Sequence, residues 1–245
     1  MIGIEHVGEV AVVRFEHGKV NALDLELLHA ITATMNELSS AGAIVLTGAG
    51  RAFSAGVDLR RIADGGVPYA EEFLPALSEA FLAVFDCPRP VVAAINGHAL
   101  AGGCIIAAAA DLRLMSGGTI GLTELLVGVQ FPTVPLEIAR YAFGPRAARL
   151  ALTAGTYDAD TALRLGLVDE VVSADELLPV AIKRAAQLAG YPANVYAATK
   201  EQLHRDARRR IDDRRVADDK AATEVWTDGA TLGNIKAFLD ELGSR

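Results

Sequence analysis

Short apolar runs alternate with glycine-rich stretches and helical patterns along the first half of this chain, and that alternation constrains its fold most. The apolar runs are 43–47, 91–95 and 111–115, and glycine-rich stretches at 48–56 and 97–103 follow the first two. Continuous apolar runs of this length, bounded by turn residues, are typical of strands buried on both faces. Because each glycine-rich stretch leads into a helical pattern, the sequence predicts an α/β fold with functional loops where strands end.

Further elements are predicted on either side of these runs. Residues 2–15 alternate with a period of two around Gly8, which indicates a β-hairpin. A helix opens at 21–24 and its apolar spacing lasts until Gly42. Later helical patterns cover 58–62, 69–85, 104–110, 147–153, 158–166 and 174–188. The charged stretch 200–220 is typical of a solvated helix with i,i+4 ion pairs, a binding surface being the alternative. The sequence itself contains no visible internal repeat.

The composition excludes several classes of function. With 51% hydrophobic and 22% charged residues, the 245 residues suit one globular domain with an appended helical part. The formal net charge of −8 makes non-specific nucleic-acid binding unfavourable. Asp111 and Arg113 interrupt the alanine-rich centre, so we expect no membrane span, and without an evident signal peptide we expect a cytoplasmic protein. Cys87 and Cys104 lack metal-ligand spacing, so no metal site is predicted.

Two small-residue turns are candidates for binding a developing negative charge. The turn at 53–58 precedes a helix, so its backbone N–H groups could face an oxyanion, although an N-cap by Asp58 is the structural alternative. The turn at 97–103 also follows a strand and precedes a helix, with tight helix–strand packing as its alternative. Two N–H donors from two such units are what an oxyanion hole requires.

Together the two turns resemble the crotonase, or enoyl-CoA hydratase/isomerase, superfamily. The resemblance is carried by Ala52-Phe-Ser-Ala-Gly-Val-Asp-Leu59 and by Ala94-Ile-Asn-Gly-His-Ala-Leu-Ala-Gly-Gly-Cys104. Three other segments are similar to family motifs: Lys19-Val-Asn-Ala-Leu23, Ala110-Asp-Leu-Arg113, and Leu152-Thr-Ala-Gly155 with the stretch 162–172 that follows it. The chain is identified as a member on these motifs, which span roughly residues 19–172.

The resemblance implies a fold, a substrate and an assembly. Residues 1–190 would form a ββα superhelix, and residues 191–245 a helical region that mediates assembly into a homotrimer or a dimer of trimers. The substrate would be an acyl-CoA thioester, with coenzyme A as part of the substrate and no separate cofactor. The oxyanion donors would be the backbone N–H groups of Ala55 and Gly102.

The resemblance also implies which residues would contact coenzyme A. These are Lys19, Ala22, Ala55, Gly56, Val57, Asp58, Leu59 and Gly102. Arg51, Arg60 and Arg61 are further candidates for its phosphates. From the family alone, Lys236 and Phe238 in the last helix could reach the adenine, in this subunit or a neighbouring one.

One departure from the family pattern decides between its chemistries. Hydratases of the family carry two glutamates that together handle water, whereas here the first position is Ile105 and only the second, Glu124, is retained. Moving a double bond from the 3-enoyl to the 2-enoyl position requires a single base. We therefore expect an isomerase in which Glu124 carries the proton. A hydratase with one degenerate carboxylate, or a homologue that only binds acyl-CoA, are the alternatives.

Neighbouring residues bear on that expectation. Apolar side chains at Ile105, Leu122, Leu125 and Leu126 are candidates to line the pocket of Glu124, where burial would raise its proton affinity. Glu124 could instead simply begin a helix. Glu137 is a rival carboxylate, His98 is expected to take no direct part, and the prolines in 129–135 should stiffen the loop after Glu124.

Overall fold

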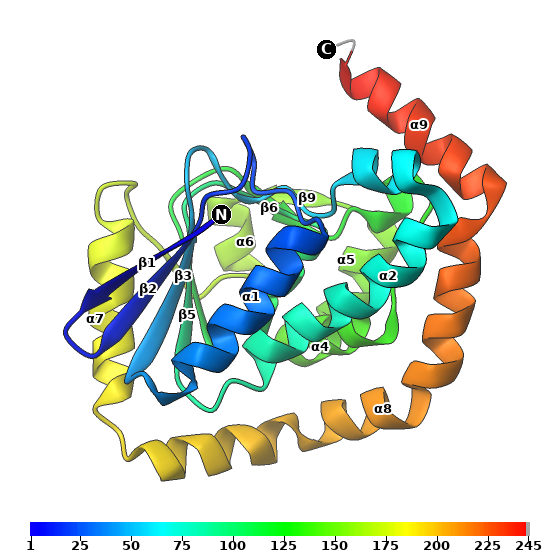
Figure 1. The fold of residues 1–245 in the computed structure, drawn as a ribbon. Coiled ribbons are helices and arrows are strands. Elements are labelled where there is room, and N and C mark those ends of the chain that lie inside the picture. The colour runs from blue at the N-terminus through cyan, green and yellow to red at the C-terminus, as the bar shows by residue number, and fades with distance from the viewer. Residues whose placement is uncertain (244–245) are drawn as a thin grey trace.

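Two sheets stand side by side at the centre of the fold, in a computed structural model that describes residues 1–243 (Figure 1). Within those residues, the larger sheet has the order β1 (Ile2–Val7), β2 (Val10–Phe15), β3 (Ala43–Gly48), β5 (Val91–Ile95), β7 (Leu112–Met115) and β10 (Glu170–Val171). The smaller sheet has the order β4 (Ala52–Ser54), β6 (His98–Leu100), β8 (Thr119–Gly121) and β9 (Thr156–Asp158). Among these described strands, only the pairs β1–β2 and β8–β9 are antiparallel.

Helices connect and cover the sheets. They are α1 (Leu25–Glu37), α2 (Leu59–Phe85), α3 (Gly102–Ala109), α4 (Thr133–Phe143), α5 (Arg146–Thr153), α6 (Ala159–Arg164), α7 (Leu177–Ala189), α8 (Ala193–Thr227) and α9 (Gly229–Gly243). Two short 3-10 helices, η1 (Leu38–Ser40) and η2 (Glu124–Val127), complete the set in the described part of the chain. None of the helices in residues 1–243 is long and apolar enough to cross a membrane.

The chain winds through the two sheets in repeated turns. A strand of the larger sheet, a short strand of the smaller sheet and a helix follow each other three times: β3–β4–α2, β5–β6–α3 and β7–β8–η2/α4. This confirms the predicted α/β fold with a ββα superhelix. The repeat escapes detection in the sequence because the strands β4, β6 and β8 have only three residues each. The glycine-rich stretches are predicted as loops, yet β4 and β6 lie inside them.

The core explains why the apolar runs form strands. Every residue of β3 and β5 is buried, as predicted for strands covered on both faces. Alternate residues of β2 divide between two cores: Val13 and Phe15 face α1 to α4, whereas Val10 and Val12 pack beneath α7. The hairpin, the helix ending before Gly42 and the strand at 111–115 are also confirmed, with boundaries shifted by a few residues.

The helix α2 is broken near its beginning. Gly66 adopts φ 58° and ψ −147°, which separates the first turns from the long second part. The two helical patterns predicted at 58–62 and 69–85 are therefore confirmed as two segments of one element. Pro68 follows the break, where its missing N–H costs little.

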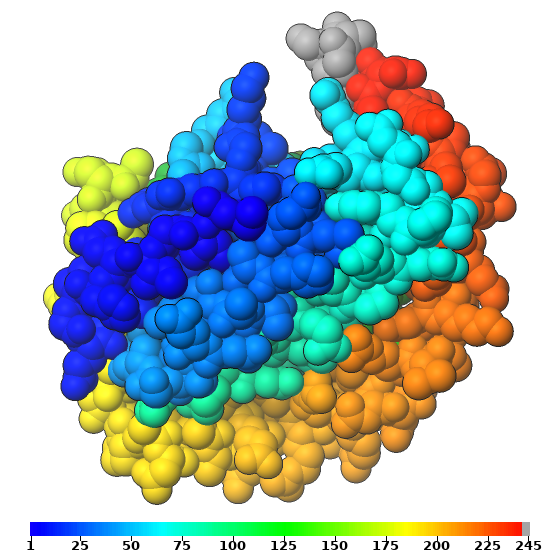
Figure 2. All heavy atoms as spheres, viewed as in Figure 1, coloured from blue at the N-terminus to red at the C-terminus, as the bar shows by residue number. Residues whose placement is uncertain are grey.

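The last two helices lie on the outside of the core. α8 passes along the lower edge of the molecule in Figure 2 and rises beside α2 and α4. α9 continues along the upper edge, where it contacts α2 and η2. The stretch 200–220 is helical as predicted, and it carries ion pairs such as Arg208–Asp212 and Arg215–Asp219.

Candidate active site

The parallel pairing in the smaller sheet brings the three candidate segments to one edge. β4 pairs with β6, and β6 pairs with β8, all running the same way. Residues 55–58, 101–102 and 122–124 follow these three strands directly. Because the carboxyl ends of parallel strands meet at one edge, the two small-residue turns and Glu124 must emerge together.

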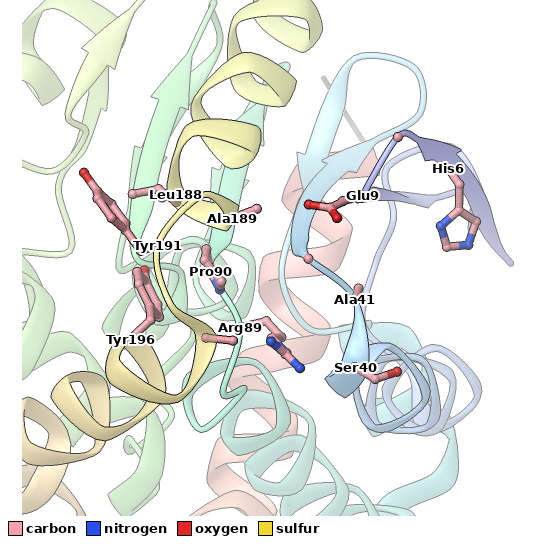
Figure 3. A pocket seen from close by; sticks show the side chains of 13 residues that line it. His6, Glu9, Ser40, Ala41, Arg89, Pro90, Leu188, Ala189, Tyr191 and Tyr196 are labelled. Carbon is pink, nitrogen blue, oxygen red and sulfur yellow. The ribbon is translucent and has the colours of Figure 1, made fainter.

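A separate cavity lies at the opposite end of the larger sheet, away from the edge where the two turns and Glu124 emerge. It has a volume of about 470 Å³ and is lined by residues that precede β2, β3 and β5, among them Glu9, Gly42 and Pro90 (Figure 3). Tyr191 and Tyr196 from the α7–α8 region close its side. It therefore lies at the amino ends of those strands, whereas ligands of open α/β sheets bind at the carboxyl ends.

The two turns are in direct contact through glycine. Gly56 has φ +86°, and a Cβ atom added there would lie 2.7 Å from the Leu100 carbonyl oxygen and 3.4 Å from the Gly102 nitrogen. A Cβ atom added to Gly102 would lie 2.7 Å from Cδ1 of Leu23 and 3.3 Å from Cζ of Phe81. Gly56 therefore requires glycine, because a side chain there would push against the backbone of the other turn, whereas at Gly102 a side chain would meet the packed side chains of Leu23 and Phe81.

The predicted oxyanion donor at Ala55 is wrong. Its N–H donates to the Val20 carbonyl at 3.0 Å, so the hydrogen is already used inside the fold. Val57, two residues later, has no acceptor for its N–H among residues 1–243. Leu23 bonds on both sides of it, donating to the Gly56 carbonyl at 2.8 Å and accepting from the Asp58 N–H at 2.8 Å. In a parallel bridge, a residue bonds to the two neighbours of the residue opposite it. Leu23 therefore bonds to Gly56 and Asp58, and the N–H of Val57 between them points away from Leu23.

Gly102 offers the second backbone N–H. It is the first residue of α3, where helical N–H groups have no partner within the helix, and its N–H has no acceptor in the described residues. Ala101 precedes it with φ 47° and donates its own N–H to the Gly121 carbonyl at 2.9 Å. That bond ties the turn to β8, and the Gly102 nitrogen lies close to Gly56, the residue before Val57.

The Lys19–Leu23 motif holds the first turn in place. The Asn21 side chain donates to the carbonyls of Ala49, Ala52 and Phe53 at 3.3, 3.0 and 3.3 Å. Ser54 Oγ donates in turn to the Asn21 carbonyl at 2.8 Å. Asn21 tolerates φ 51° here, as asparagine does more readily than most residues. This motif therefore shapes the loop before Val57 through hydrogen bonds between side chains and backbone carbonyls.

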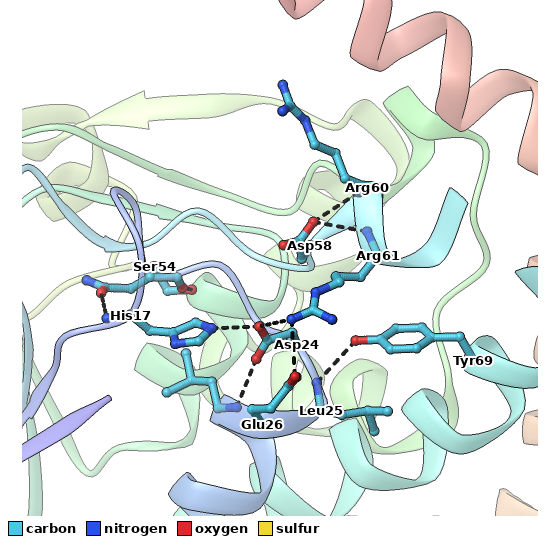
Figure 4. Close-up of polar contacts among 11 residues, drawn as sticks. His17, Asp24, Leu25, Glu26, Ser54, Asp58, Arg60, Arg61 and Tyr69 are labelled. Carbon is cyan, nitrogen blue, oxygen red and sulfur yellow. Dashed lines mark hydrogen bonds and ion pairs between the residues drawn. The ribbon is translucent and has the colours of Figure 1, made fainter. Parts of the chain in front are cut away.

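A polar cluster ties the beginnings of α1 and α2 together (Figure 4). Asp24 caps α1 by accepting the Leu27 N–H at 2.9 Å, and it contacts His17 Nε2 at 2.6 Å. Arg61 reaches Glu26 at 3.1 Å. Asp58 accepts the N–H groups of residues 60 and 61 at 3.0 and 3.2 Å, so the structural alternative for this residue, a cap of α2, is confirmed.

Glu124 provides a buried carboxylate at the same edge. Part of the residue is exposed, but its Oε2 is buried and has no hydrogen-bond partner within residues 1–243. Burial raises the pKa of Glu124 to about 8. Burial also raises the pKa of the Cys104 thiol on α3, and the nearby Glu124 carboxylate raises it further. The carboxyl group therefore lies within electrostatic range of Cys104 on α3, which is next to Ile105 in sequence.

The lining of Glu124 follows the prediction only in part. Ile105 and Leu122 are fully buried, as expected of an apolar wall. Leu125 and Leu126 are 45% and 57% exposed, so these two candidates do not belong to a buried wall. The short 3-10 helix η2 turns both leucines outward, an effect that a local apolar pattern does not reveal.

The rival polar groups are occupied elsewhere. Glu137 is buried between Arg140 at 2.5 Å and Arg210 at 2.6 Å, so both of its oxygens are paired. His98 is exposed on the small sheet and bonds Thr119 Oγ1 at 3.0 Å. Neither residue is available to share a proton with Glu124.

Positive charge is available near the first turn. Lys19, Arg51 and Arg60 are exposed, and their side chains have no ion-pair partner in the part of the chain that the structure describes. Arg60 points away from the polar cluster in Figure 4. Arg61 is instead paired with Glu26. On α9, Phe238 packs partly against the core.

Fold and site together define a class of protein. The family model for enoyl-CoA hydratase/isomerase matches residues 5–241, so the chain belongs to the enoyl-CoA hydratase/isomerase family of enzymes. This confirms the resemblance to the crotonase superfamily drawn from the motifs.

Particular members of the family are similar over nearly the whole chain. Enoyl-CoA delta isomerase 1, mitochondrial, of Rattus norvegicus is 30% identical over 98% of this chain and 86% of its own length. The short-chain-enoyl-CoA hydratase of Clostridium acetobutylicum is 29% identical over 97% of this chain and 94% of its own length. Among solved structures, human mitochondrial delta3-delta2-enoyl-CoA isomerase superposes with a TM-score of 0.93 at 26% identity, covering 99% of this chain and 98% of the other.

Proposed function

We propose that the protein is an isomerase that shifts the double bond of a 3-enoyl-CoA to the 2-enoyl position. The observation that carries the proposal is the Glu124 carboxyl group, which is buried beside α3 with its Oε2 unpaired among residues 1–243. Ile105, fully buried, occupies the position where family hydratases have their other glutamate. The similarity to enoyl-CoA delta isomerases, both in sequence and in structure, supports the proposal.

The proposed reaction moves one proton and one pair of double-bond electrons. Ionised Glu124 removes a proton from C2, and the electrons of that C–H bond form the C1–C2 double bond of an enolate. The Val57 and Gly102 N–H groups donate to the thioester oxygen, where the negative charge develops. The enolate then collapses to a C2–C3 double bond, while the former C3–C4 pair takes the proton from Glu124 at C4. Beyond the thioester itself this chemistry needs no cofactor.

Burial suits Glu124 for this exchange. A carboxyl group with a pKa near 8 binds the C2 proton more readily than an exposed one with an ordinary pKa near 4.5. The apolar side chain of Ile105 offers no hydrogen bond to a water molecule, which disfavours hydration at the same carbon atoms. For the coenzyme A part, the exposed cations Lys19, Arg51 and Arg60 are the proposed phosphate contacts.

A hydratase is the second candidate, because the chain is also similar to a short-chain-enoyl-CoA hydratase. In that case Glu124 would act on a water molecule held by other groups. The two candidates differ in substrate preference: an isomerase converts a 3-enoyl-CoA far faster than it hydrates a 2-enoyl-CoA. A homologue that only binds acyl-CoA would convert neither.

The test compares wild type with Glu124→Gln on a 3-enoyl-CoA, measuring the 2-enoyl product. Loss of the base should lower kcat by roughly 100-fold or more, whereas the exposed control Glu176→Gln should leave it unchanged. Because Glu124 must be ionised to accept the C2 proton, kcat/KM of wild type should rise with pH through about 8. Equal rates for wild type and Glu124→Gln would remove Glu124 from the mechanism.

Substitutions of Ile105 provide a second test, which distinguishes an isomerase from a hydratase. Ile105→Glu should raise hydration of a 2-enoyl-CoA, because it restores a second carboxylate beside Glu124, whereas Ile105→Gln should not. Hydration by wild type at a rate close to isomerisation would favour the hydratase.

We also propose that the protein self-associates, as a homotrimer or a dimer of trimers. The support is an exposed apolar face next to η2, made of Leu125, Leu126 and Leu152, of which Leu152 is 75% exposed. Two of these leucines, Leu125 and Leu152, border a depression of about 520 Å³ that includes Phe131 and Ala148. Exposed apolar patches of this kind mark interaction sites more often than plain surface.

A further inference from the structure

The loop that follows Glu124 is held from outside by the last turns of α8. Trp226 donates its indole Nε1–H to the Gln130 carbonyl at 2.7 Å. Asp219 Oδ1 accepts the Thr133 N–H at 2.8 Å, and so caps the first turn of α4. These two bonds fix the loop 128–132 at its centre and at its end, from residues that lie far away in the sequence.

Glu124 depends on this loop for its position. Its Oε2 has no hydrogen-bond partner among residues 1–243, so that oxygen is not held in place directly. What orients the residue is the backbone of η2, which is closed by the Val129 N–H donating to the Glu124 carbonyl at 3.3 Å. Gly128, in the left-handed conformation with φ 75°, joins η2 to the loop. A shift of Val129 would therefore move the backbone that carries the carboxylate.

α8 is a rigid support for this task. Arg215 pairs with Glu79 of α2 at 2.8 Å and with Asp219 at 3.4 Å, so the residue that caps α4 is itself held. Arg210 pairs with buried Glu137 of α4 at 2.6 Å. Trp226 is 2% exposed, with its ring against Phe73 of α2. The second half of α8 is thus anchored to both α2 and α4.

We propose that Trp226 and Asp219 are positioning residues for Glu124: by fixing the loop 128–132 they set where its carboxyl group lies relative to the Val57 and Gly102 N–H groups. The proposal rests on the proposed function, in which Glu124 carries the proton. It gives α8 a part in the reaction in addition to its packing against the core. Misplacing a reacting group by about 1 Å can cost roughly 100-fold in rate, so two lost hydrogen bonds at the loop would have a measurable effect.

The test uses the full chain and three variants of these residues. Trp226→Phe keeps an aromatic ring but removes the N–H, and Asp219→Ala removes the acceptor for Thr133. Asp219→Asn keeps an oxygen acceptor and should restore most of the activity. For the first two variants we expect kcat on a 3-enoyl-CoA to fall by about tenfold or more, with KM within about twofold.

The pH profile separates positioning from packing. If the loop loosens, water reaches Glu124, and the midpoint of the kcat/KM profile should move from about 8 toward the ordinary range of a carboxyl group. Arg208→Met is the matched control, because it breaks pairs with Asp86 and Asp212 without touching the loop. It should lower stability and leave kcat and the midpoint as in wild type.

Clear outcomes overturn the proposal. If Trp226→Phe and Asp219→Ala lose stability but keep the wild-type kcat and midpoint, their role is packing alone. Failure of the proposed function is a separate result, seen when Glu124→Gln is as active as wild type. In that event the pKa of Glu124 can still be measured without turnover. The free energy of unfolding is followed against pH in wild type, Trp226→Phe and Asp219→Ala, each with and without Glu124→Gln. If the pKa of Glu124 is the same in these variants as in wild type, the proposal that Trp226 and Asp219 position Glu124 is refuted as well.

Discussion

At the scale of single residues, Glu124 connects function with stability. Its pKa is raised by burial from an ordinary value of 4.5 to about 8. Between these values the folded protein holds a proton that the unfolded chain has released, so stability falls as pH rises through this window. Below it both states are protonated, and above it the folded state carries the full cost of a buried charge. The site therefore keeps its base at the expense of stability.

Glu124→Gln should remove that pH dependence, because glutamine does not ionise. We expect wild type and variant to have similar free energies of unfolding at pH 4.5, and the variant to be more stable by a few kcal/mol at pH 9, since one pKa unit corresponds to about 1.4 kcal/mol. Urea unfolding across this pH range measures the difference. Parallel curves for the two proteins would show that Glu124 titrates as an exposed carboxyl group does.

Residue-scale prediction from sequence succeeds where the cause is local. The capping of α2 by Asp58 depends on residues two and three positions away, and it is confirmed. The donor predicted at Ala55 is wrong because its partner, Val20, comes from another loop. The N–H group that the described residues leave free in this segment belongs to Val57, which becomes clear only from the isolated bridge between Leu23 and Val57.

At the scale of elements, the short strands of the smaller sheet assemble the site. β4 and β6 have three residues each, with too few apolar side chains for a strand pattern, and their extended shape comes from pairing with each other. Longer strands such as β3 and β5 are predictable because their burial on both faces dictates apolar runs. The elements that sequence patterns miss are therefore those that bring the turns together.

Close contact between the turns makes Gly56 intolerant of a side chain. Gly56→Ala would place a Cβ atom 2.7 Å from the Leu100 carbonyl oxygen, at φ +86°. We expect a loss of about 1–3 kcal/mol and a large loss of isomerisation, because the Val57 and Gly102 N–H groups would separate. Urea unfolding and turnover of a 3-enoyl-CoA measure the two effects.

Gly233→Ala is the matched control for that substitution. Gly233 lies within α9, and a Cβ atom added there would meet no described atom within 4 Å apart from its chain neighbours and the backbone of its own helix. Alanine should therefore stabilise the protein by up to about 1 kcal/mol, because it favours the helix over glycine. If Gly56→Ala behaved in the same way as Gly233→Ala, the turns would not need their close approach.

At the scale of the whole molecule, the exposed leucines beside η2 predict a solution assembly. Replacing Leu152 by glutamate puts charge into the apolar face that we propose as the contact between subunits. Wild type should sediment as a species several times larger than its 25.7 kDa chain, and Leu152→Glu as a monomer. Val7→Glu, at an exposed position of the N-terminal hairpin, should leave the assembly intact. A monomeric wild type would refute the contact.

Some contacts of the helix α8 could not be predicted from the sequence, because they join residues that are distant in it. The charged pattern of 200–220 correctly predicts a helix with i,i+4 pairs. That pattern does not reveal that Arg210 neutralises Glu137, or that Asp219 caps α4. Each of these partners is distant in sequence, so only the path of α8 around the core brings them into contact.

The sequence by itself determined the α/β class, the long elements, the family and the pair of glycine-rich turns. These follow from local causes: apolar periodicity, capping residues, and motifs in which glycine is required by the backbone. The tertiary structure alone decided which N–H groups are free, that one carboxylate oxygen of Glu124 is buried without a partner in the described residues, and that α8 contacts its loop. Hydrogen-bond partners and burial are properties of segments brought together from far apart, and no local pattern records them.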